Sequence, residues 1–69
     1  MKRWYILKFV RARERADPGA AFVSMPVCAE EGQLDGIKED WAMQLEEQTG
    51  VPWVCREVTE MEVEPGNDD

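Results

Sequence analysis

Residues 3–12 have the sequence RWYILKFVRA, and this stretch decides the fold. It is rich in aromatic and β-branched side chains and contains neither glycine nor proline, so it predicts a β-strand. Successive side chains of a strand point to opposite faces. One face then carries large apolar groups throughout: Tyr5, Leu7 and Phe9. The other face is similar apart from one lysine: Trp4, Ile6, Lys8 and Val10. Because both faces are largely apolar, we expect the central strand of a sheet, with the more polar second face outward.

Two further segments have strand composition. Residues 21–29 (AFVSMPVCA) predict a second strand, antiparallel to the first, reached through a polar connection that ends in the turn signal Asp17-Pro18-Gly19. Pro26 cannot donate a ladder hydrogen bond, so we expect this strand at an edge or bulged there. Residues 51–64 predict a third strand, which alternates in polarity beyond Arg56.

Between the second and third strands the apolar spacing becomes helical. The stripe consists of Leu34, Ile37, Trp41, Ala42 and Leu45. This spacing predicts a helix that buries one face, with Trp41 in the core. Gly50 is expected to end the helix, because glycine readily adopts the left-handed backbone of a C-terminal cap.

The order of elements predicts an α+β fold: a single ββαβ domain with a three-stranded antiparallel sheet and one helix packed on one face. A chain of 69 residues supports one core, so we expect one domain over residues 1–65 and a disordered acidic tail over 66–69. No apolar run approaches the roughly 20 residues that span a bilayer, and none resembles a signal peptide. We therefore expect a cytoplasmic monomer that does not bind membranes.

No catalytic or metal-binding pattern stands out. The chain has two cysteines, Cys28 and Cys55, and no histidine, so it cannot alone supply the four ligands of a structural zinc site. We expect both thiols to be reduced and to lie in or near the core. Glycine-rich phosphate loops and calcium-loop spacing are also missing from the sequence. The sequence thus predicts a protein that is not an enzyme and that binds no cofactor or metal.

Charge is sorted along the chain. Residues 1–15 sum to +5 and residues 16–69 to −12, giving the net charge of −7. Direct binding to nucleic acid is disfavoured by this charge, and a basic protein surface is favoured. The arginines at 11, 13 and 15 lie near aromatic side chains, which would also suit an RNA-binding strand. We favour the interpretation that they neutralise acids of the same molecule.

The third strand and the helix supply the candidate binding residues, which share exposed charge. The candidates are Arg56, Glu57, Glu60, Glu62, Glu64, Asp35, Glu39 and Asp40. Such a strip could dock on a groove rich in lysine and arginine, with charge steering the encounter. Alternatively, charges on an edge strand serve only to block aggregation.

Two stretches resemble a known family. Residues 26–30 (PVCAE) followed by Leu34-Asp35, and later Val51-Pro52 with Glu57-Val58-Thr59, are similar to the small inhibitor of bacterial RNA polymerase made by T7-like phages. With one-residue gaps the resemblance covers residues 4–65. It implies a ββαβ fold and binding to the jaw of the polymerase β′ subunit, which blocks initiation. That family carries functional arginines after the Val-Thr pair, whereas residues 60–64 here read EMEVE, so those arginines are not carried over.

Our first hypothesis is a phage-type protein that binds bacterial RNA polymerase in the host cytoplasm and inhibits transcription initiation stoichiometrically near the DNA channel. The β′ subunit, or the sigma factor, is the expected contact. The alternative is an acidic nucleic-acid mimic that blocks a host defence nuclease or CRISPR complex. A third option is an accessory subunit of a larger assembly.

Overall fold

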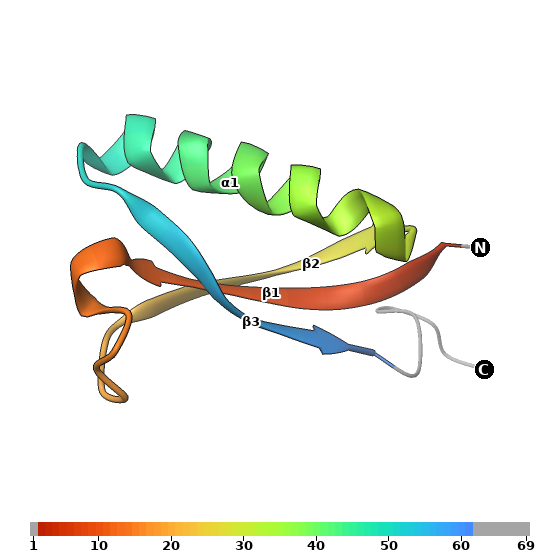
Figure 1. Cartoon of the computed structure of the whole chain (residues 1–69), viewed down its shortest axis with the longest axis horizontal. Coiled ribbons are helices and arrows are strands. Elements are labelled where there is room, and N and C mark those ends of the chain that lie inside the picture. Colours follow the sequence, from red (N-terminus) through yellow and green to blue (C-terminus); the bar gives the residue numbers. More distant parts are fainter. Residues whose placement is uncertain (1, 62–69) are drawn as a thin grey trace.

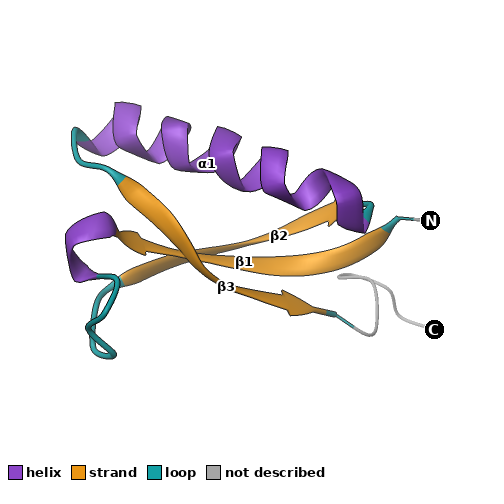
Figure 2. Ribbon diagram, in the orientation of Figure 1, coloured by secondary structure: helices purple, strands orange, loops and turns teal. Residues whose placement is uncertain are grey.

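The computed structural model describes residues 2–61. Its elements in chain order are β1 (Arg3–Arg11), the 3-10 turn η1 (Ala12–Glu14), β2 (Phe22–Ala29), the 3-10 turn η2 (Glu31–Gln33), α1 (Leu34–Thr49) and β3 (Trp53–Glu60). The strands form one antiparallel sheet in the order β2-β1-β3. The helix α1 lies along one face of this sheet (Figures 1 and 2). The predicted α+β class and the ββαβ order are confirmed.

The core lies between β1 and α1. Leu7 and Phe9 are completely buried and pack against Leu45 of the helix. Half-buried side chains from β2, α1 and β3 surround them: Met25, Val27, Leu34, Ile37, Ala42, Trp53 and Cys55. The helix therefore covers the more apolar face of β1, as the alternation in that strand predicts.

Two local features at the β2 edge of the sheet follow from the sequence. Pro26 lies in the edge strand β2, opposite Ile6 of β1, and an edge strand is where a residue without a backbone N–H is tolerated. The turn before β2 forms as predicted. There the backbone N–H of Gly19 donates to Asp17 Oδ1 at 2.9 Å, and that of Ala20 donates to the Asp17 carbonyl oxygen at 3.1 Å.

The helix ends at the predicted glycine. Gly50 adopts a left-handed backbone with φ of 78°, and its N–H donates to the Glu46 carbonyl oxygen at 2.8 Å. At the other end, Gln33 Oε1 accepts a bond of 3.1 Å from the N–H of Glu30, which completes a capping box around η2. The chain thus enters and leaves α1 at fixed positions.

The prediction that Trp41 lies in the core is wrong. Its exposed fraction is 37%, and it lies outside the core cluster. A sheet of three strands offers the helix a narrow surface, and smaller side chains of the stripe, such as Ile37 and Leu45, occupy it. The indole, much larger than these, therefore remains partly in solvent.

The two cysteines differ in their positions. Cys55 is half-buried and packs against the core cluster, as expected, but Cys28 is exposed, so the expectation of a core or near-core thiol there is wrong. The register explains the difference. Cys28 faces Trp4 on the side of the sheet away from α1, whereas Cys55 faces Phe9 on the helix side. Both thiols are free.

The third strand is an edge strand, and it is described as far as Glu60. Glu62 and Glu64, and the predicted tail over 66–69, lie outside the described residues. Within residues 2–61, α1 is too short and too polar to cross a bilayer.

Candidate functional site

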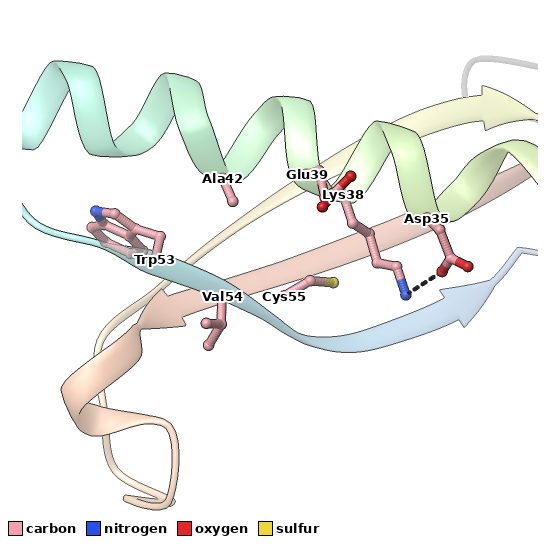
Figure 3. A pocket seen from close by; sticks show the side chains of 7 residues that line it. All are labelled: Asp35, Lys38, Glu39, Ala42, Trp53, Val54 and Cys55. Atoms are coloured by element: carbon pink, nitrogen blue, oxygen red, sulfur yellow. Dashed lines mark ion pairs between the residues drawn. The ribbon is translucent and has the colours of Figure 1, made fainter.

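One candidate site in the described part of the chain is a groove between α1 and β3 (Figure 3), with a volume of about 520 Å³. Four lining residues come from the helix: Asp35, Lys38, Glu39 and Ala42. Three come from the start of the edge strand: Trp53, Val54 and Cys55. The Val54 side chain points away from the helix in Figure 3, so this residue borders the groove mainly through its backbone.

The apolar end of the groove is held in place by Trp53. Its indole Nε1–H donates to Thr49 Oγ1 at 2.7 Å, and the Thr49 hydroxyl donates in turn to the Leu45 carbonyl oxygen at 2.7 Å. The Arg11 guanidinium lies 5.8 Å from the centroid of the indole ring. These contacts tie the first residue of β3 to the last turn of α1, so this side of the groove is preformed.

A β-bulge shapes the strand beside the groove. Phe9 faces Cys55 whereas Lys8 faces Glu57, which leaves Arg56 without a partner on β1. The Arg56 guanidinium donates from Nη1 to the Asp17 carbonyl oxygen at 2.8 Å, so the bulge fastens β3 to the connection between β1 and β2. Bulges increase local twist, and β3 is visibly twisted in Figure 1.

The rim of the groove is charged. Lys38 Nζ lies 3.2 Å from Asp35 Oδ1, one helical turn away (Figure 3). Glu39 is exposed and makes no ion pair with another described residue. The three ionised rim side chains therefore leave one uncompensated negative charge beside an apolar surface.

A smaller hollow of about 320 Å³ lies near the far end of β3, and it is lined by Arg3, Tyr5, Glu30, Glu31 and Glu60. Arg3 Nη1 donates to Glu60 Oε2 at 2.8 Å, and the bond and the negative charge raise the pKa of the Arg3 guanidinium. Both side chains are about half exposed, so the pair adds little stability.

The structure separates the predicted binding residues into several places. Asp35 and Glu39 meet at the groove, whereas Glu60 lies in the smaller hollow. Glu57 faces Lys8, on the side of the sheet away from α1. Asp40 is exposed on α1 and does not line the groove. The role of these residues in binding stays a prediction.

Sequence reasoning missed the apolar part of the groove. Trp53 and Cys55 are two residues apart on one strand, so alternation alone places both on the helix-facing side. Asp35, Glu39 and Ala42 recur at helical spacing and share one flank of α1. These two signals together could have located the groove.

A scan against protein-family models, a search of curated proteins and a search of solved structures each found no match to this chain. Residues 2–61 also contain no cluster of three or more side chains suited to hold a metal ion.

Proposed function

We propose that this chain is a stoichiometric binding protein whose α1–β3 side docks on a basic surface of a partner protein. One observation carries the proposal: a preformed apolar groove with an uncompensated acidic rim lies directly beside an edge strand. Glu39 supplies the charge, and Trp53 and Ala42 supply the apolar surface.

The chemistry of the groove suits a segment that presents an apolar side chain next to lysine or arginine. The apolar side chain would displace water from Trp53, which burial of apolar surface favours. The cation would pair with Glu39 and, at longer range, with Asp40 on the same helix. Charge attraction of this kind mainly raises the association rate and makes it sensitive to salt.

The partner that we propose is bacterial RNA polymerase, contacted at its β′ subunit or the sigma factor, with inhibition of initiation in the host cytoplasm. Support comes from the short motifs that resemble the phage inhibitor family and from the ββαβ order that this family shares. No turnover is expected, because inhibition would follow from occupancy of the site.

The test measures binding of the full chain to purified bacterial RNA polymerase holoenzyme by biolayer interferometry at several salt concentrations. We expect Glu39→Gln to weaken binding by about three- to tenfold, as for loss of one interfacial charge contact. The matched control is Glu47→Gln, which removes the same charge from an exposed position of α1 outside the groove. Absence of binding to the holoenzyme would rule out this partner.

The nucleic-acid mimic remains the competing proposal. Lys38 on the groove rim and Arg3 beside Glu60 interrupt the acidic surface, which argues against a surface that imitates the continuous negative charge of a phosphate backbone. A mimic would displace DNA or guide RNA from a nuclease and leave transcription in vitro unchanged, so a transcription assay separates the two.

A further inference from the structure

The face of the sheet opposite α1 is a second, separate surface. The strand register places apolar side chains there from two neighbouring strands: Trp4, Ile6, Phe22, Pro26 and Cys28. Trp4 and Ile6 are half-buried, Pro26 and Cys28 are exposed, and Phe22 has an exposed fraction of 53%. Among the described residues, no helix covers this free face (Figure 2).

One end of the free face is enclosed by the described part of the chain. The connection between β1 and β2 bends toward this side of the sheet (Figure 1), where Arg56 binds the Asp17 carbonyl oxygen. Val10 at this end is completely buried. Within residues 2–61, no other segment covers the face between Phe22 and Trp4.

The dimensions of the face fit one helix. Strands of eight residues, as in β2, extend about 26 Å, and three strands together are about 14 Å wide. A helix is about 10 Å in diameter, and 16 residues, the length of α1, span about 24 Å. The α1 helix covers the opposite face of the same sheet with these dimensions.

Charge argues against a second copy and indicates the character of the partner. Lys8 and Glu57 face each other across β1 and β3, so the centre of the face is nearly neutral, with Lys8 4.1 Å above the Phe22 ring. Two chains of charge −7 would repel each other.

Arg13 and Arg15, next to the enclosed end, are exposed and form no ion pair within residues 2–61. They would favour acidic groups there.

We propose that the free face binds one amphipathic helix of a partner protein, with its apolar stripe on Trp4, Ile6 and Phe22 and its acidic end at Arg13 and Arg15. This surface lies on the other side of the sheet from the α1–β3 groove, so the inference does not depend on the partner proposed for that groove.

The test uses the full chain and a synthetic 16-residue helical peptide with a leucine stripe and glutamates in its last turn. A matched control peptide has lysines in place of those glutamates. Alkylation of the two thiols is followed by mass spectrometry. At a peptide concentration about four times Kd, Cys28 should react about fivefold more slowly, because only the unbound fraction reacts. Cys55, on the helix-facing side, serves as the internal control and should keep its rate. Unchanged alkylation of Cys28, or equal protection of both thiols, overturns the proposal.

Two variants sharpen the test. Phe22→Ser should weaken peptide binding by about tenfold, whereas Val23→Ser, at the adjacent position and on the opposite face of β2, should change it little. The double variant Arg13→Glu and Arg15→Glu alters only exposed side chains and should reverse the preference toward the lysine peptide. The proposal is overturned if the two serine variants have equal effects, or if the double variant keeps its preference for the glutamate peptide. It is also overturned if a single-stranded oligonucleotide, and not the helix, protects Cys28.

Discussion

Gly36 and Gly50 occupy the two ends of α1 and have opposite backbone requirements. Gly36 lies in the first turn, and a Cβ atom added there would meet no atom within 4 Å. Gly50 has φ of 78°, which side chains other than glycine rarely adopt. We expect Gly36→Ala to raise the free energy of unfolding by about 0.5–1 kcal/mol, because alanine restricts the unfolded chain.

The matched variant Gly50→Ala should lower the free energy of unfolding by about 1 kcal/mol through strain in the left-handed cap. Urea titration followed by far-UV circular dichroism measures both variants. Equal shifts of the two variants in the same direction would contradict this account of the helix ends.

Trp53 and Thr49 form the bond that closes one end of the groove. Trp53→Phe keeps an aromatic ring but removes the Nε1 donor, so we expect a loss of about 0.5–1.5 kcal/mol in the free energy of unfolding. Thr49→Val removes the acceptor and also the bond to the Leu45 carbonyl oxygen. A double-mutant cycle isolates the bond itself. A coupling energy of zero would show that the indole is held by packing alone.

At the scale of the elements, stability depends on the contact between β1 and α1. Leu7 is completely buried at the centre of the core, and truncation of such a side chain costs about 2–5 kcal/mol. A domain of this size has roughly 3–5 kcal/mol of stability in total. We therefore expect Leu7→Ala to be largely unfolded at 25 °C, with Ser24→Ala, at an exposed position of β2, close to the parent chain. Amide dispersion in a nuclear magnetic resonance spectrum distinguishes these outcomes, and a well-dispersed Leu7→Ala spectrum would contradict the assigned core.

Several elements follow directly from the sequence. The apolar content of both faces of residues 3–12 places β1 at the centre, and the helical stripe with Gly50 fixes the course of α1. The exposure of Trp41 does not follow from the sequence, because the width of the sheet limits how large a side chain the helix can bury. The side of the sheet on which Cys28 lies depends on pairing with Trp4, a relation between distant residues that composition does not contain.

The bulge in β3 has a signal that the alternation argument passed over. Val54 and Cys55 are both apolar, and Arg56 and Glu57 are both charged, so strict alternation fails at that point. A strand with an extra residue produces this pattern, because the faces exchange across the bulge. Asp35 and Glu39, the acidic residues of the groove, were predicted from the sequence as binding residues. Their position beside Trp53 was not predicted, because it depends on how α1 packs on β3.

For the whole molecule, the excess of acids should make stability depend on salt. Exposed acids such as Glu39, Asp40 and Glu47 repel one another in a chain of net charge −7. Screening becomes strong as ionic strength rises from 0.01 to 0.15 M, where the Debye length falls from about 30 to 8 Å. We expect sodium chloride over this range to raise Tm by a few degrees, about 0.5 kcal/mol for a domain of this length.

A double variant, Asp40→Asn with Glu47→Gln, should show a smaller rise in Tm, because less repulsion remains to be screened. Differential scanning calorimetry at fixed pH provides the comparison. A fall in Tm with salt would mean that attractive pairs such as that of Arg3 and Glu60 outweigh the repulsion.

The central position of β1 has a consequence for biosynthesis. This strand leaves the ribosome before either neighbour, yet its pairing with β3 joins Tyr5 to Glu60, almost the full length of the described chain. The nascent polypeptide must therefore keep two apolar strand faces unsatisfied until translation has passed the last strand. Folding should therefore wait for the synthesis of β3 and then be abrupt, and a ribosome stalled before residue 53 should present a chain that is sensitive to protease and bound by chaperones.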